Sequence, residues 1–124
     1  MNDSTDDFLD NWSIQVRKGV IELCILNALR DDERYGYELV KSLVAVPGLD
    51  VAEGTVYPLL SRLRQQGVVT TRLEESPSGP ARRFYALTEA GRARLEAMNR
   101  YFFALGAAVG AVAHSGAGKP AEAR

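Results

Sequence analysis

The sequence predicts a mainly α fold of the α+β class, on three observations. Apolar residues recur with helical spacing in several segments of residues 14–66, a strand–turn–strand pattern covers residues 68–87, and a long helical pattern follows over residues 89–113. Three helices followed by a two-stranded hairpin is the order of a winged helix-turn-helix, in which the hairpin is the wing. We therefore expect a winged helix-turn-helix with a long C-terminal dimerisation helix. The 124 residues, 46% of them hydrophobic, suffice for one such domain.

The first 13 residues are expected to form an acidic arm with a short helix. Ser4 or Thr5 can cap a helix that carries Phe8 and Trp12. The dense apolar run Ile14–Leu29 is too long for one strand and shorter than a membrane span, so it predicts a separate buried helix.

Two shorter helices are expected next. The first covers Tyr35–Val44 and is closed by a Pro47–Gly48 turn. The second, the candidate recognition helix, covers residues 53–66 and ends at Gly67 as its C-cap.

This recognition helix has one apolar and one polar face. Val56, Leu59, Leu60 and Leu63 recur at i, i+3, i+4 and i+7 and are expected to pack inward. The outer face combines small residues with groups that hydrogen-bond base edges or phosphates, namely Gly54, Thr55, Tyr57, Pro58, Ser61, Arg62, Arg64 and Gln65. No acidic residue occurs between Gly54 and Leu73, so no carboxylate of this stretch repels a phosphate. The alternative is an ordinary polar surface helix.

The hairpin is predicted from two strand-like runs, residues 68–73 and 82–87, joined by a turn over residues 74–81. Arg82 and Arg83, with Arg72 on the outgoing strand, are expected to contact phosphate. The alternative is a salt bridge across the hairpin to Glu74 or Glu75. Because Arg82 and Arg83 point to opposite faces of an alternating strand, we expect these two roles to be split between them.

The last predicted helix opens with Thr88 as N-cap and continues to about Ala113, followed by a tail over residues 114–124 that we expect to be disordered. Its apolar residues follow a heptad spacing, and a GxxxG step lies among them. With Trp12, they form the expected dimer interface of Leu95, Met98, Phe102, Leu105, Gly106, Val109, Gly110 and Val112. Packing against the first helix of the same chain is the alternative, and a membrane span is disfavoured by the Gly- and Ala-rich composition.

Composition argues against an enzyme. One cysteine and one histidine leave no metal-site spacing and no nucleophile–base pair, and no phosphate-binding glycine loop is present. We therefore expect no metal, no cofactor and no membrane association. The acidic, polar N-terminus lacks the pattern of a signal peptide, which favours the cytoplasm.

The charge is distributed unevenly. Residues 1–50 carry five Lys or Arg against ten Asp or Glu, whereas residues 51–100 carry eight against five. A basic middle favours an anionic partner such as a phosphate backbone, although a mixed solvated surface would give the same counts.

Three motifs together resemble the PadR family of transcription regulators. They are Arg34–Leu39 (RYGYEL), Glu53–Leu63 (EGTVYPLLSRL) and Gly79–Arg92 (GPARRFYALTEAGR), in that order. The wing of the family normally reads Arg-Lys-Tyr-Tyr, and Arg-Arg-Phe-Tyr here keeps the charge. The single C-terminal helix is similar to that of the smaller subfamily.

The resemblance implies a homodimer that binds an inverted-repeat, double-stranded DNA operator, usually as a repressor, through the recognition helix and the wing over residues 74–83. It implies a phosphate contact at Tyr35. Ser78 and Gly79, in the predicted turn of the wing, are further candidate DNA-binding residues. Some small members bind flat aromatic effectors between paired C-terminal helices, which makes Trp12, Tyr101, Phe102 and Phe103 candidates for such a site. A winged-helix protein–protein interaction module is the alternative function.

Overall fold

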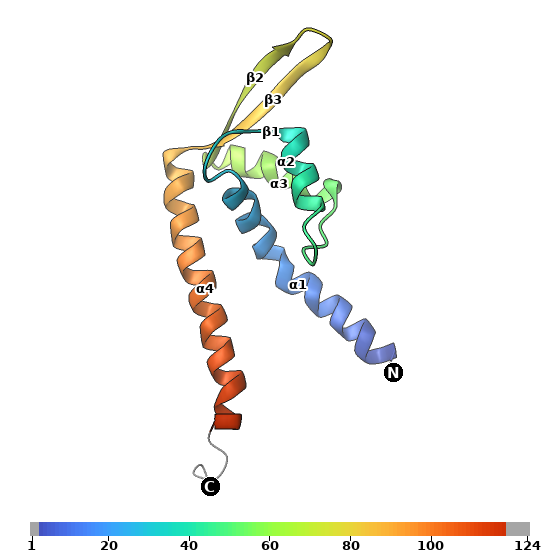
Figure 1. Ribbon diagram of the computed structural model, residues 1–124, viewed down its shortest axis with the longest axis vertical. Helices are drawn as coiled ribbons and strands as arrows, with labels where there is room; N and C mark the ends of the chain where they lie inside the picture. The colour runs from blue at the N-terminus through green and yellow to red at the C-terminus, as the bar shows by residue number, and fades with distance from the viewer. Residues whose placement is uncertain (1–2, 119–124) are drawn as a thin grey trace.

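The computed structural model describes residues 3–118, which form four α-helices and three β-strands (Figure 1). In chain order the elements are α1 Asp3–Ala28, β1 Arg34–Tyr35, α2 Gly36–Val44, α3 Glu53–Gln65, β2 Val69–Ser76, β3 Gly79–Leu87 and α4 Glu89–Gly118. The order confirms the predicted winged helix-turn-helix with a long C-terminal helix.

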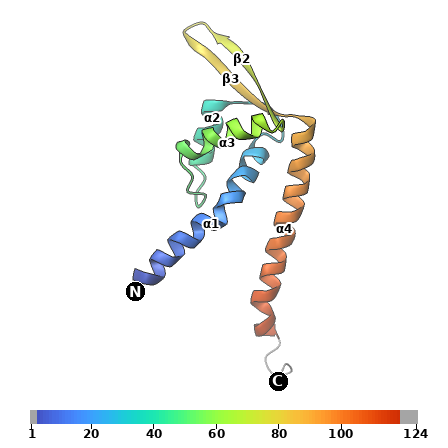
Figure 2. The ribbon, with the colours of Figure 1, turned by 180° about the vertical axis from the view of Figure 1, so that it is seen from behind.

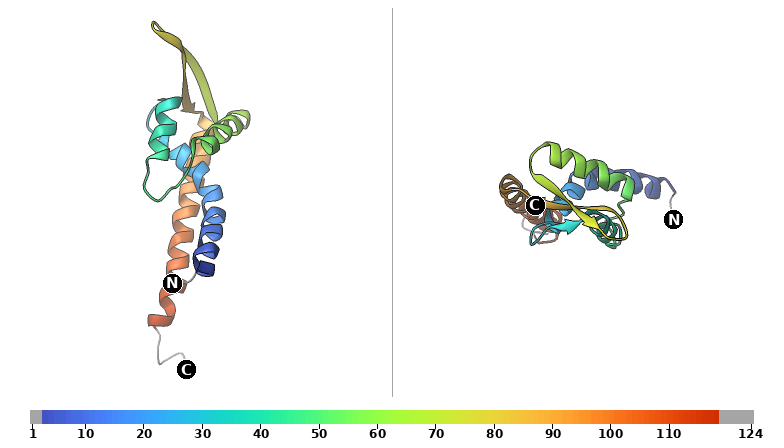
Figure 3. Two further views of the ribbon diagram at one scale, coloured as in Figure 1. Left: turned by 90° about the vertical axis from the view of Figure 1, so that its right-hand side faces the viewer. Right: turned by 90° about the horizontal axis from the view of Figure 1, so that it is seen from above.

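The sheet is antiparallel with the strand order β1-β3-β2. The β2–β3 hairpin projects from one end of the molecule, and α4 runs to the opposite end (Figures 1 and 2). Helices α1, α2 and α3 gather at the base of the hairpin, and α3 lies across the C-terminal part of α1 (Figure 3). The wing and the C-terminal helix therefore extend from one common core.

That core is built from the inner faces of all four helices and the base of the hairpin. Its residues are aliphatic, and several have no exposed surface. They are Ile21, Leu23, Ile25, Leu26, Leu29, Leu39, Val40, Leu43, Val51, Val56, Leu60, Leu63, Val68, Val69, Leu87 and Leu95.

The N-terminal region differs from expectation. Instead of a short helix and then a second one, α1 is a single helix of 26 residues. The only strong helix breaker between Phe8 and Ala28 is Gly19, which one helix tolerates at a cost of about 1 kcal/mol. Cys24 is half-buried against the core, and burial raises the pKa of its thiol.

The wing is longer than predicted and its turn is shorter. Strand pairing continues past Leu73 to Glu74↔Arg82 and Ser76↔Gly79, with an irregularity between Glu74 and Ser76. The two-residue strand β1, which was not predicted, pairs Arg34 with Tyr85 and thereby ties the start of α2 to the wing. Helix α2 consequently begins at Gly36, with Tyr35 as its N-cap residue.

A Schellman motif ends α3 at Gly67, the glycine predicted to terminate the helix. Gly67 lies one position beyond the C-cap residue, Gln66. Gly67 has a φ of +79°, its amide bonds to Arg64 O at 3.0 Å, and the Val68 amide bonds to Leu63 O at 3.1 Å. Thr88 then caps α4, since its hydroxyl accepts from the Gly91 amide at 3.0 Å and donates to Gly67 O at 2.7 Å. These bonds connect the end of α3 to the start of α4.

Helix α4 continues through Gly118, so the first part of the tail predicted to be disordered is helical. Residues 119–124 of that tail lie outside the described residues. Over residues 3–118, no helix combines the length and apolarity that crossing a bilayer requires.

Candidate nucleic-acid interface

Helix α3 presents the face that the sequence predicted. Val56, Leu60 and Leu63 are fully buried and Leu59 is half-buried, which confirms the inner face. The predicted outer residues are all exposed, namely Gly54, Thr55, Tyr57, Pro58, Ser61, Arg62, Arg64 and Gln65. Pro58 lies inside the helix, where its missing amide leaves the carbonyl of Gly54 without a helical donor.

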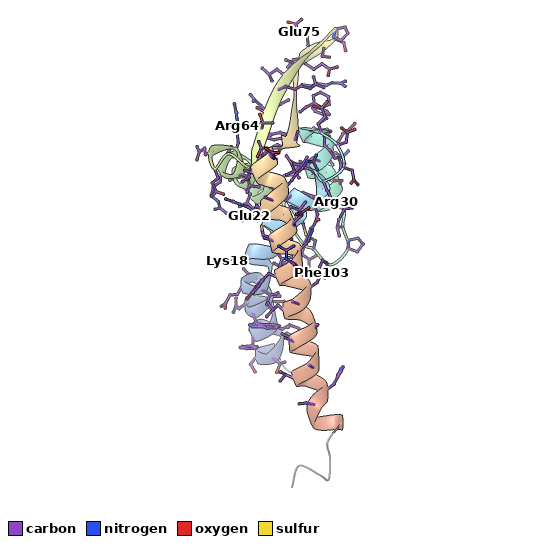
Figure 4. The ribbon with its side chains drawn as sticks, turned by 90° about the vertical axis from the view of Figure 1, so that its left-hand side faces the viewer. Lys18, Glu22, Arg30, Arg64, Glu75 and Phe103 are labelled. Carbon is purple, nitrogen blue, oxygen red and sulfur yellow. The ribbon has the colours of Figure 1, made fainter. Side chains whose placement is uncertain are left out.

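The two arginines of α3 differ in their partners. Arg62 Nη2 lies 2.7 Å from Glu22 Oε2 of α1, so this side chain points toward the body of the molecule. Arg64 has no acidic partner among residues 3–118 and extends away from α1 (Figure 4). Arg64 is therefore the cation of α3 that is most available to a phosphate or a base.

The arginines of the wing also differ from one another. Arg72 forms ion pairs with Glu33, at 2.6 Å, and Glu74, at 3.0 Å, and its guanidinium lies 4.5 Å from the Phe84 ring centroid. Neither Arg82 nor Arg83 pairs with an acidic residue of the described chain. The cross-hairpin salt bridge considered from the sequence is wrong for both, because the carboxylate of Glu74 bonds Arg72 along its own strand.

Arg82 and Arg83 have separate surroundings, as expected for neighbours on a strand. The guanidinium of Arg82 lies 5.3 Å from the centroid of Tyr35, at the entrance to α2. Arg83 donates to the Thr71 hydroxyl at 3.2 Å. Arg82 is thus held beside the predicted phosphate-contacting Tyr35.

An aromatic cluster joins α2 to the wing. The Tyr35 ring lies 6.1 Å from Tyr37 and 5.8 Å from Phe84, and Lys41 Nζ lies 5.2 Å from the Tyr37 centroid. Tyr37, Lys41 and Phe84 were not among the site residues predicted from the sequence. The Tyr-Gly-Tyr spacing at the start of α2 was the available signal for Tyr37, which is half exposed on the same side as Tyr35.

Gly36, between Tyr35 and Tyr37, permits the close approach of the Tyr85 ring to α2. A Cβ atom at this position would lie 2.7 Å from Tyr85 Cε1. Tyr57 of α3 lies near the same rings, and partial burial, with Glu53 next in importance, raises the pKa of its phenol. Tyr57 therefore remains a neutral hydrogen-bond donor at physiological pH.

The residues of the predicted dimer interface divide into two groups. Leu95 is 3% exposed in the core of its own chain, and Met98 and Phe102 pack against that core. Leu95 is therefore unavailable to a partner, as the intramolecular alternative required. Leu105, Val109 and Val112 are 44%, 59% and 76% exposed, so the second half of the heptad pattern is uncovered in the protomer.

A groove of about 600 Å³ separates α1 from α4 and is lined almost entirely by apolar atoms. Of the predicted effector residues, Tyr101 and Phe102 line it, whereas Trp12 and Phe103 do not. Phe103 packs edge to face on Phe102, at 5.5 Å between centroids, and faces outward from α4. Across the described residues, no group of three His, Cys, Asp or Glu side chains is placed to hold a metal ion.

Comparison with known proteins identifies the family. The sequence profile of the "Transcriptional regulator PadR-like family" matches residues 25–97. The transcriptional regulator Rv3488 of Mycobacterium tuberculosis is 36% identical over 81 residues, which cover 65% of this chain and 74% of that protein. The transcriptional regulator YqjI of Escherichia coli is 35% identical over 80 residues, and the match spans 37% of its length.

Solved structures agree. A PadR family transcriptional regulator from Eggerthella lenta has a TM-score of 0.76 and 30% identity, covering 88% of this chain and 95% of that one. Bacillus subtilis PadR in complex with operator DNA has a TM-score of 0.58 and 26% identity, covering 64% of this chain and 45% of that one. The protein described here belongs to the PadR-like family of transcriptional regulators.

Proposed function

We propose that this protein is a dimeric transcriptional repressor that binds an inverted-repeat DNA operator. Helix α3 would enter the major groove, while the wing and Tyr35 would contact the flanking phosphates. The observation that carries the proposal is the outer face of α3, which is exposed along its length and contains no acidic residue from Gly54 to Leu73. The structural relative solved with operator DNA supports the same role.

The unpaired cations fit this role. Arg64, Arg82 and Arg83 form no ion pair with a described acidic residue, so their charge is available to phosphate. Ser61 and Gln65, exposed beside Arg64, are suited to hydrogen bonds with base edges. Arg72, which already holds two carboxylates, is better suited to positioning the wing than to contacting DNA directly.

Dimerisation would occur through α1 and α4. Exposed apolar residues line both helices beyond the core, including Trp12 on α1 and Val109 and Val112 on α4. Gly106 and Gly110 lie on the same part of α4, with nothing within 4 Å of a Cβ atom at either position, so a second backbone can approach. Two copies so joined would place their recognition helices about 34 Å apart, one turn of DNA.

An aromatic effector would bind in the α1–α4 groove and release the operator. Tyr101 and Phe102 offer stacking surfaces there, next to Val20 and Met98. Because α4 connects directly to the wing through Thr88, a shift of α4 in the dimer would move the two recognition helices relative to each other.

The test is fluorescence anisotropy with the duplex upstream of the protein's own gene and a scrambled duplex, at two salt concentrations. We expect selective binding that weakens steeply with salt and saturates at one dimer per site. Arg64→Ala should reduce affinity about tenfold, the loss of a good arginine contact. The matched control Arg100→Ala, which removes an exposed arginine of α4, should bind as the wild type does.

Equal binding to both duplexes would contradict operator recognition. The absence of binding to either at low salt would instead favour a protein–protein interaction module.

A further inference from the structure

A second hollow, of about 500 Å³, lies between α1, the α2–α3 loop and α3. Arg17, Lys18 and Ile21 of α1 line it, whereas Val16 and Val20 of the same helix line the groove toward α4. These two sets of residues fall on opposite faces of α1. The hollow is therefore separate from the groove assigned above to the dimer and its effector.

Cations surround this hollow. Arg17 and Lys18 contribute from α1, and neither forms an ion pair with a described acidic residue. Arg62 contributes from α3 and shares its charge with Glu22 through a 2.7 Å contact. Lys18 and Glu22 lie on the side of α1 over which α3 passes (Figure 4). Two unpaired cations and one shared cation thus face one space.

The remaining walls are mostly apolar. Ile21 and Val51 are core residues, 8% and 6% exposed, whose edges line the hollow, and Leu59 of α3 is half-buried beside them. Thr55 adds a hydroxyl from the first turn of α3. The one carboxylate of the lining belongs to Asp50, an exposed loop residue with a φ of +52°.

We propose that this hollow binds a small amphipathic anion, a carboxylate carried on an apolar body. The carboxylate would accept charge-assisted hydrogen bonds from Arg17 and Lys18, and the apolar body would cover Ile21, Val51 and Leu59. A neutral ligand of the same shape would leave the cations without a counter-charge. A compact inorganic anion would leave the apolar wall uncovered. The combination of cationic and apolar walls selects ligands that have both parts.

Occupancy of the hollow would also affect α3. Thr55 and Arg62 belong to both the hollow and the proposed recognition helix, and an added carboxylate competes with Glu22 for Arg62. A ligand there adds negative charge beside the DNA-facing surface and lowers operator affinity. This effect on DNA rests on the proposed function, whereas binding of the anion does not.

The test uses octanoate as the probe and octanamide as its neutral counterpart, in calorimetric titrations of the full chain. We expect octanoate to bind at least tenfold more tightly than octanamide. Arg17→Gln combined with Lys18→Gln should abolish this preference. Arg17 is half-buried and Lys18 is exposed, and neither belongs to the core, so the double variant leaves the core intact. Arg100→Gln is the matched control for charge, and Tyr101→Ala is the control for the separate α1–α4 groove; both should retain the preference.

Equal affinity for octanoate and octanamide, or no octanoate binding by the wild type, would overturn the site. A loss of binding in Tyr101→Ala with unchanged binding in the double variant would place the probe in the groove and also overturn it.

In the anisotropy assay, octanoate should weaken operator binding by the wild type and not by the double variant. A protein that binds no DNA at all would refute the proposed function, while the calorimetry would still decide the site.

Discussion

Arg72 holds both carboxylate oxygens of Glu33, with Nε 2.9 Å from Oε1 and Nη2 2.6 Å from Oε2. Glu33 directly precedes β1, and Arg72 is in β2, the outer strand of the wing. The bridge therefore spans the sheet between the body and the wing. Such a bidentate pair is directional, so it restrains the orientation of the wing against α2 and α3.

The first prediction concerns the titration of Glu33. The hydrogen bonds from Arg72 hold the pKa of the Glu33 carboxyl below its ordinary value. Because the pKa is lower in the folded than in the unfolded state, the bridge stabilises the fold fully above the ordinary carboxyl pKa. The contribution is lost as the pH falls through the folded pKa. In carboxyl-detected NMR titrations, Arg72→Gln should raise the pKa of Glu33, and Arg64→Gln should leave it unchanged. An unchanged Glu33 titration in Arg72→Gln would show that the bridge is absent in solution.

The second prediction concerns the start of α4. A Cβ atom at Gly91 would lie 2.1 Å from the carbonyl oxygen of Val68, which accepts a hydrogen bond from the Thr88 amide at 3.1 Å. Gly91→Ala forces the start of α4 away from the Val68 carbonyl. The cost of this displacement exceeds the gain of about 1 kcal/mol in helix propensity. We expect the free energy of unfolding to fall by about 2 kcal/mol in urea titrations. Gly54→Ala, with nothing within 4 Å of its Cβ, is the matched control and should not destabilise. Equal stability of the two variants would refute the close approach.

The third prediction concerns an amide pair between α1 and α4. Asn27 Nδ2 donates to Asn99 Oδ1 at 3.0 Å, and Asn99 Nδ2 donates to Asn27 Oδ1 at 2.9 Å. Each alanine substitution leaves one half-buried amide without its partner, so each should cost about 1 kcal/mol. The double variant should lose less than the sum, with a coupling energy of about 1 kcal/mol in a double-mutant cycle. Strict additivity would argue against the pair, and the exposed Asn11→Ala should have little effect.

The fourth prediction tests the proposed dimer interface on the exposed apolar face of α4, called the seam below. Val109 is 59% exposed on the apolar face of α4, and Ala107 lies on the opposite face of the same helix. Val109→Asp would bury a carboxylate in the proposed interface and should shift the protein from dimer to monomer in analytical ultracentrifugation. Ala107→Asp adds the same charge outside the seam and should remain dimeric. Dissociation by Ala107→Asp alone would place the interface on the other face of α4.

Local patterns predicted much of this protein. The inner face of α3, the end of that helix at Gly67 and the hairpin that follows all depend on residues a few positions apart. Helical periodicity and the left-handed conformation that glycine adopts operate over this range, so the sequence alone determined which face of α3 is exposed. That face contains most of the proposed DNA contacts.

Tertiary packing decided which charged groups remain available. Arg62 and Arg64 belong to the same helix, yet Arg62 pairs with Glu22, 40 residues away, and Arg64 has no acidic partner in the described chain. Arg72 is likewise held by Glu33, 39 residues away. The division of the α4 heptad between Phe102 and Leu105 has the same origin, because the core of the protomer covers only the first turns of that helix. The partner of a long charged side chain, and the part of a helix that remains exposed, depend on which elements pack together. The spacing of neighbouring residues in the sequence does not contain that information.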